Sequence, residues 1–268
     1  MAGSDRGSNQ GKRPTKAERR EEARLQREAI QRKMAARRRN RSIGLALVVV
    51  AAATAVVAVF VTASGGSGIP SAQDLLKAAP AAVKTAGCDA VQTTPNYQNA
   101  KGDDPDVDHT HIGSTTTFAT PPPLSSYPTT PPASGPHDPT PLSAGVYPSP
   151  PGVYNAVHAL EHGGTIIWYS PDASGEQLDQ ILAFYGQRQK EANVGQDRVI
   201  VAPYSYPSEG DAGTLPKGAQ MVLVSWHRMQ TCANVNLAVA FDFTSQYSYP
   251  SWNGRPWKGV AREPGGIM

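Results

Sequence analysis

An uninterrupted apolar segment constrains this chain more than any other feature. Residues 42–73 carry no charged side chain, and residues 43–63 are 21 positions composed mainly of Leu, Val, Ala, Ile and Phe. As a helix, this segment would measure about 31 Å at roughly 1.5 Å per residue, enough to cross the hydrocarbon core of a bilayer. It therefore predicts a single transmembrane helix over residues 43–63. A cleaved signal peptide is the alternative, but signal peptides have a shorter apolar region, about 7–15 residues, and a shorter preceding arm.

The distribution of charge predicts how that helix is oriented. Residues 1–41 contain fourteen Lys or Arg against five Asp or Glu, whereas the whole chain carries only +3. Basic residues abut the apolar segment on its N-terminal side, and the first one after it is Lys77. Lys and Arg accumulate on the cytoplasmic side of membrane segments. We therefore expect a cell-membrane protein that crosses the bilayer once, with a cytoplasmic N-terminus and an extracytoplasmic C-terminal part.

The basic arm, residues 1–42, is rich in Ala, Arg, Glu, Gln and Lys, which favour a polar helix. Basic residues near a membrane surface are attracted to anionic lipid headgroups. We accordingly expect the lipid bilayer and its anionic headgroups as partners of this arm. The arm lacks interleaved aromatic residues and any nucleic-acid-binding motif, so we expect no nucleic-acid partner.

The part beyond the membrane segment divides by composition into a linker with a membrane-proximal helix (64–84), a folded domain (85–250) and a C-terminal tail (251–268). Buried strands are predicted at 165–169, 198–202 and 220–226, a helix up to about residue 191, and a second helix within 234–243, where a strand is the alternative. Pro80 is expected to interrupt the membrane-proximal helix, and the tail is expected to pack loosely. The fold class is α+β, with a small sheet covered on one face by helices.

A proline-rich stretch between residues 95 and 151 is the least regular part of the domain. Such stretches are often linkers, but this one contains histidines and tyrosines that a linker would not need. We predict a long ordered loop that wraps over the core. Fixed proline φ angles would lower the entropy cost of ordering it.

Two histidines four residues apart, His158 and His162, are the strongest chemical signal. Their imidazoles share one face on a helix or on a strand, whereas Glu161 joins them only on a helix. Pro151 and Gly152 end a loop, Asn155 can cap, and Gly163 can terminate a helix, so a short helix is favoured.

Five of the six histidines lie within residues 109–162, and imidazole is the commonest protein metal ligand. We hypothesise that His158 and His162 provide two ligands, His137 a third, and His109 or His111 a fourth. Glu161 would be a further ligand or would orient one of the rings. Imidazole suits copper and zinc alike, so a copper or zinc ion is the expected cofactor. The candidate metal residues are His109, His111, His137, His158, Glu161 and His162.

The order of these motifs resembles a bacterial family described as domain of unknown function 3105. The resemblance rests on His109-Thr110-His111, residues 131–137, Gly145-Val146-Tyr147, residues 158–163 and Tyr169-Ser170-Pro171, and on the preceding anchor and Ala86-Gly87-Cys88. It spans roughly residues 80–250. This sequence departs from the family pattern at Ala133, where Thr is expected, and at Asp138, where an aromatic residue is expected. The resemblance implies a membrane-anchored exported domain and no established activity.

Two alternative functions remain open. His158-x-x-Glu161-His162 reproduces the spacing of inverted zincins, which would imply a zinc-dependent hydrolase, although those enzymes place it on a long helix. A non-catalytic interaction module that docks a membrane-protein partner would explain the Pro- and Tyr-rich surface. No serine nucleophile elbow, glycine-rich phosphate loop or Cys-x-x-Cys pair is present, and we expect a binding protein more readily than an enzyme.

Only two cysteines are present, Cys88 and Cys232, and both follow the apolar segment. Oxidising compartments outside the cytoplasm permit disulfides. We predict one structural disulfide between them, closing a very long loop.

Overall fold

The computed structural model describes residues 69–98, 107–114, 118–191 and 198–268, all within a compact unit formed by Gly65–Met268. The basic arm and the predicted transmembrane helix at 43–63 lie outside the described residues. Within the described ranges, no helix combines the length and apolar character needed to cross a bilayer.

A six-stranded sheet forms the centre of the domain, in the order β1-β6-β5-β3-β4-β2. Strands β2 and β4, and β3 and β4, pair in parallel, and the other pairs are antiparallel. The three predicted strands are confirmed, whereas the other three were not predicted. The bounds are β1 Gln92–Thr93, β2 Gly145–Val146, β3 Thr165–Tyr169, β4 Val199–Pro203, β5 Met221–Ser225 and β6 Arg228–Cys232.

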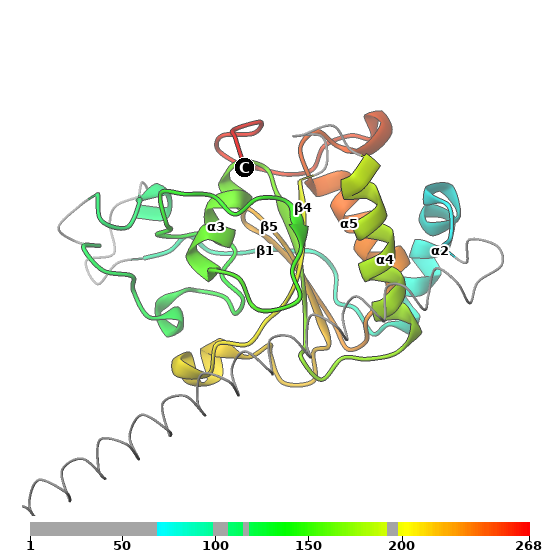
Figure 1. Cartoon of the computed structure of the whole chain (residues 1–268), viewed down its shortest axis with the longest axis horizontal. Helices are drawn as coiled ribbons and strands as arrows, with labels where there is room; N and C mark the ends of the chain where they lie inside the picture. The colour runs from blue at the N-terminus through cyan, green and yellow to red at the C-terminus, as the bar shows by residue number, and fades with distance from the viewer. Residues whose placement is uncertain (1–68, 99–106, 115–117, 192–197) are drawn as a thin grey trace, which may run out of the picture. The chain divides into compact units, whose positions relative to one another are not determined.

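Both faces of this sheet are covered, so the prediction of helices on one face only was wrong. Every position of β3, β4 and β5 is buried, as expected for strands with a packed layer on each side. Along β3, Ile167 and Tyr169 join one hydrophobic core, while Ile166 and Trp168 join the other. Figure 1 shows α2 (Ala72–Thr85), α4 (Glu176–Glu191) and α5 (Leu237–Tyr247) on one side, with α3 (Val153–Glu161) and the proline-rich segment on the other.

Helix α2 runs through Pro80 without a break, which corrects the predicted interruption. An internal proline removes one backbone hydrogen bond. Here Pro80 is exposed, while Leu75, Ala79 and Ala82 bury the opposite face in the core that α5 shares. Burial of that face offsets the lost bond. Helix α5 confirms the helical prediction for residues 234–243, and Asn236 caps it by accepting a hydrogen bond from Val239 N.

The proline-rich segment is ordered where it is described, as predicted. Two tyrosine hydroxyls attach it to the domain: Tyr154 donates to Pro122 O at 2.6 Å, and Tyr206 to Pro151 O at 2.8 Å. A third, Tyr127, donates to Pro136 O within the segment. Because proline has no N–H, a proline-rich segment has fewer backbone donors than carbonyl acceptors. Tyrosine hydroxyls supply the missing donors to these carbonyls. The short 3₁₀ helices of the domain are η1 Val107–His109, η2 Leu124–Ser126, η3 Pro207–Gly213 and η4 Trp252–Gly254.

The C-terminal tail does not pack loosely, contrary to the sequence-based expectation. Its backbone bonds to the end of α3: Glu263 N donates to Glu161 O at 3.0 Å, and Gly265 N donates to His162 O at 3.1 Å. Figure 1 shows the C-terminus beside α3. The tail therefore forms part of the surroundings of the predicted histidine motif.

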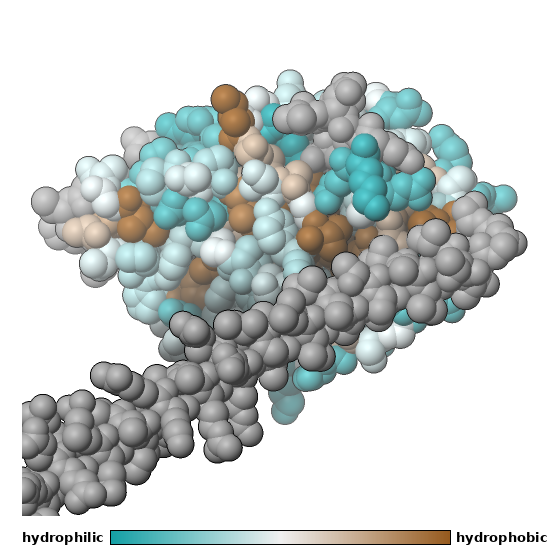
Figure 2. All heavy atoms as spheres, viewed as in Figure 1, coloured by the Kyte–Doolittle hydropathy of each residue, from teal (hydrophilic) through white to brown (hydrophobic). Residues whose placement is uncertain are grey.

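The predicted disulfide is confirmed, since Cys88 is bonded to Cys232 at 2.09 Å. It joins the segment after α2 to the end of β6. The face in Figure 2 is mainly hydrophilic, with hydrophobic residues in separate small patches. Among the described residues, Ile267 in the tail is the most exposed large hydrophobic side chain, at 88%.

Candidate metal centre

The histidine motif lies on α3 and its C-terminal cap. The helix begins after Gly152, and Asn155 does not cap it as predicted but donates from Nδ2 to Thr140 O at 2.7 Å. Gly163 ends the helix with φ +87°, a conformation that glycine adopts without strain. His158 and the cap residue His162 consequently face each other, with their Nε2 atoms 3.1 Å apart.

The proline-rich segment delivers two more imidazoles to the same place. His111 and His137 form an isolated parallel bridge, in which Ile112 N donates to His137 O at 2.7 Å. The ring centroid of His158 lies 4.9 Å from that of His111 and 4.7 Å from that of His137. His137 is completely buried. Histidines from segments 21 to 51 positions apart in the sequence are thus gathered around one point.

Backbone carbonyls orient three of the four rings. The Nδ1 atoms of His137, His158 and His162 lie 2.8, 2.6 and 2.5 Å from the carbonyl oxygens of Gly135, Asp138 and Ile267, respectively. A carbonyl oxygen only accepts, so we assign the proton of each neutral ring to Nδ1. The Nε2 atom then carries the lone pair that a metal requires, and the carbonyl acts as the outer partner that fixes the ring.

Glu161 is almost fully buried between two imidazoles. Its Oε1 lies 2.6 Å from His109 Nδ1, and its Oε2 lies 3.0 Å from His137 Nε2. Burial by itself raises the pKa of this carboxyl, but its hydrogen bond with His109 opposes that effect, and the pKa lies well below its usual range. Glu161 is therefore an anion at neutral pH.

The neighbouring histidines are held in their neutral form. Burial lowers the pKa of His158 to about 4, against a smaller opposing effect of its bond to Asp138. Burial also lowers the pKa of His111, and His137 adds to the effect. Neutral imidazole is the form that binds metals, so these rings need lose no proton to act as ligands.

Two overlapping groups of ligand atoms result. One group is His111, His137, His158 and Glu161, whose ligand atoms all lie within 4.8 Å of one another; the other is Glu161, His162 and Glu263, by the same measure. Of the predicted set, only His109 belongs to neither group. It stacks on Trp226 with ring centroids 5.2 Å apart and hydrogen-bonds to Glu161. His109 therefore positions the ligand candidate Glu161 and is not itself a ligand candidate.

Two features were missed by sequence reasoning. Glu263 lies in a tail without periodicity, so nothing in the sequence connected it to the motif. His227 binds Asp108, with Nε2 3.1 Å from Oδ2, and Asp108 also accepts from Tyr97 N and Ser134 Oγ. This pair, in which Asp108 is buried and His227 partly exposed, links η1, which carries His109, to the turn between β5 and β6.

The fold and the cluster define a mixed α+β domain with a buried His/Glu group able to hold a metal ion. The family model described as "Protein of unknown function (DUF3105)" matches residues 124–262, just over half of the chain, and the chain belongs to this family. No curated protein and no solved structure matches it. The matched range includes His137, His158, Glu161 and His162, while His109 and His111 precede it and Glu263 follows it.

Proposed function

We propose that this protein is a membrane-anchored, extracytoplasmic metal-binding protein that holds a copper or zinc ion with His111, His137, His158 and Glu161. The ligand atoms of these four residues already converge, and three of the residues are buried. Three imidazoles and one carboxylate form a four-ligand set suited to either metal.

One contact carries the proposal. His137 Nε2 is buried and lies 3.0 Å from Glu161 Oε2, yet it makes no hydrogen bond. Its proton is on Nδ1, bound to Gly135 O, so a lone pair faces a carboxylate oxygen. Two such atoms repel each other and are costly to bury unsatisfied. A cation between them would turn this repulsion into coordination, so the residues fit the group that the sequence predicts.

The hydrolase alternative receives less support. In an inverted zincin the glutamate of the motif would accept a proton from a metal-bound water. Here Glu161 already accepts a hydrogen bond from His109, and its lowered pKa makes it a weak base. Helix α3 is also only nine residues long. The position of Glu161 within the cluster favours a ligand over a general base.

The extracytoplasmic location is part of the proposal and draws on two observations. The apolar segment at 43–63 follows a basic arm, which favours a cytoplasmic N-terminus. The disulfide between Cys88 and Cys232 supports an oxidising compartment for the domain, because such bonds are rare in the cytoplasm.

Metal analysis tests the proposal directly. The full chain, purified without a histidine tag, is stripped with a chelator, loaded with zinc or copper, dialysed and analysed by mass spectrometry for metal. We expect bound metal in the wild type and a lower metal content in His158→Ala and His137→Ala. Asp172→Asn is the control, because it changes an exposed side chain that belongs to neither group. Circular dichroism verifies folding. A wild type without metal, or variants that bind as much metal as the wild type, would overturn the proposal.

A further inference from the structure

The second group of ligand atoms, Glu161, His162 and Glu263, lies at the junction of α3 with the tail. Glu161 and His162 are buried, whereas the side chain of Glu263 is 64% exposed. The group shares Glu161 with the proposed metal site. It therefore continues the buried cluster outwards to the surface.

A backbone carbonyl orients His162 in this second group, just as one orients His158 in the first group. The Nδ1 atom of His162 lies 2.5 Å from Ile267 O, which leaves the Nε2 lone pair 3.4 Å from Glu263 Oε2. The tail also backs the ring, since a Cβ atom on Gly266 would lie only 2.7 Å from His162 Cγ. A glycine is required for this close approach, so the imidazole is held with Nε2 directed towards both the Glu263 carboxylate and His158 Nε2, which lies 3.1 Å away.

The backbone of Glu263 is fixed although its side chain is exposed. Its N–H donates to Glu161 O at 3.0 Å, and its carbonyl accepts from Gly266 N at 3.0 Å. Arg198 also holds this part of the tail: its Nη1 donates to Gly266 O and, at 3.2 Å, to His162 O. The carboxylate is thus held beside His162 Nε2 while remaining open to water.

We propose that Glu161, His162 and Glu263 bind a second divalent cation, so that the centre is dinuclear and bridged by Glu161. This inference rests on the proposed function, because the bridging carboxylate belongs to the first site. One imidazole and two carboxylates suit zinc, and an exposed site with three protein ligands leaves positions for water. Paired metal ions that share ligands characteristically lie about 3.5–4 Å apart.

Zinc stoichiometry tests the second site separately from the first. The full chain without a histidine tag is stripped of metal and titrated with zinc alone, and bound zinc is measured after equilibrium dialysis. We expect two zinc ions per wild-type chain and one in Glu263→Gln, with the second dissociation constant raised roughly tenfold or more. Glu263 is exposed, so this variant should fold normally.

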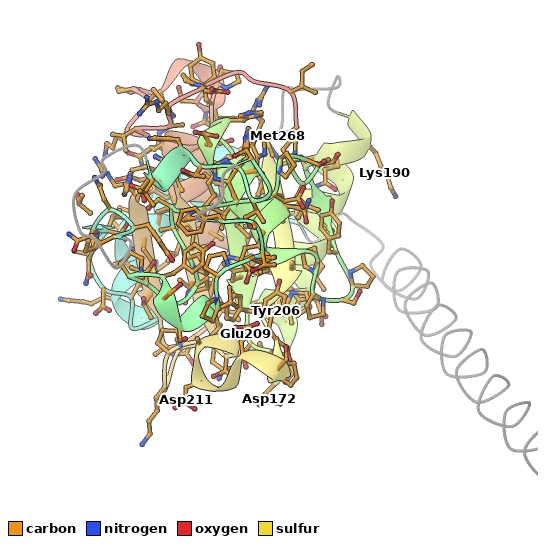
Figure 3. All side chains as sticks on the ribbon, turned by 90° about the vertical axis from the view of Figure 1, so that its left-hand side faces the viewer. Asp172, Lys190, Tyr206, Glu209, Asp211 and Met268 are labelled. Carbon is orange, nitrogen blue, oxygen red and sulfur yellow. A yellow bond between two sulfur atoms is a disulfide. The ribbon has the colours of Figure 1, made fainter. Side chains whose placement is uncertain are left out.

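Asp211→Asn is the matched control, because it neutralises an exposed acid on η3. In Figure 3, Asp211 lies at the opposite end of the domain from Met268. It should keep two zinc ions. Loading with two equivalents of Cu²⁺ gives an independent readout: coupled ions would show a half-field signal in electron paramagnetic resonance, and Glu263→Gln would lose it.

Each outcome is decisive. A single zinc ion in both the wild type and Glu263→Gln would overturn the second site and leave the first intact; Glu263 would then serve only as an ion-pair partner of His162. Two zinc ions in both proteins would place the second ion elsewhere and would also overturn the inference. A wild type that binds none would overturn both proposals together.

Discussion

At the scale of single residues, backbone carbonyls decide what the histidines can do. Asp138, where the resemblance led us to expect an aromatic residue, holds His158 through its main-chain oxygen, so its side chain is not needed for that contact. The same holds for Gly135 and Ile267. A sequence lists imidazoles without showing which nitrogen is protonated, and that choice depends on these carbonyls.

Substitution of Gly135 tests this dependence. Gly135 has φ +123°, and a Cβ atom there would lie 2.6 Å from Tyr127 Cε1. Tyr127 is itself buried, so we expect Gly135→Ala to displace the backbone and with it the carbonyl that binds His137. We expect a loss of roughly 1–3 kcal/mol in the free energy of unfolding, measured with denaturant, and a zinc dissociation constant raised about tenfold.

Gly175→Ala separates the two effects of the added methyl group. Gly175 also has a positive φ, +99°, but a Cβ atom would meet nothing within 4 Å. This control should lose only about 1 kcal/mol of stability and no zinc affinity. If Gly135→Ala behaved in the same way, the Gly135 carbonyl would not be fixing the ligand.

At the scale of elements, the sequence predicted the parts whose periodicity or composition is strong. β3 is a run of β-branched and aromatic residues, and Leu237, Ala240 and Phe241 show helical spacing. β6 was missed because only two residues, Trp226 and His227, separate it from β5. His227 has a positive φ, and the usual sequence signal for such a turn is Gly or Asn, which is absent here. β1 and β2 have two residues each, too few for any pattern.

The tyrosine bonds that hold the proline-rich segment make stability sensitive to alkaline pH. Burial is the main cause that raises the pKa of Tyr154 to about 12 from its ordinary value of 10.0. The folded state then keeps a proton that the unfolded state releases. The contribution of Tyr154 is fully present below about pH 10 and is lost as the pH rises towards 12.

Tyr154→Phe should reduce this loss of stability between pH 10 and 12. At pH 7 it should cost about 1 kcal/mol, because Pro122 O loses its donor. Thermal unfolding followed by circular dichroism at pH 7, 10 and 11 measures both effects. Tyr249→Phe, at a tyrosine 37% exposed, is the control. An unchanged alkaline loss in Tyr154→Phe would exclude this residue as a source of the pH dependence.

At the scale of the whole molecule, the candidate site draws on segments that only the fold brings together. The sequence predicted that His158, His162 and His137 would converge with His109 or His111, because five histidines in one stretch are improbable as isolated surface residues. It could not predict Glu263 or the tail carbonyl of Ile267, since the contacts that bring them to α3 are backbone hydrogen bonds without a sequence pattern. Distant backbone pairing is visible only in three dimensions.

The disulfide closes a loop that contains every ligand candidate except Glu263. Cys88 and Cys232 are 144 residues apart, and in the chain-entropy model a bond across so long a loop stabilises by roughly 4–5 kcal/mol. We expect the double variant Cys88→Ala/Cys232→Ala to lose about this much in denaturant unfolding, and the reduced wild type to lose a similar amount. Reductant should leave the variant unchanged, which controls for its other effects.

The bond constrains the unfolded chain more than the folded site, so zinc affinity below the unfolding transition should be retained. A variant that unfolds like the oxidised wild type would show that the sheet and its two cores hold the domain without this link.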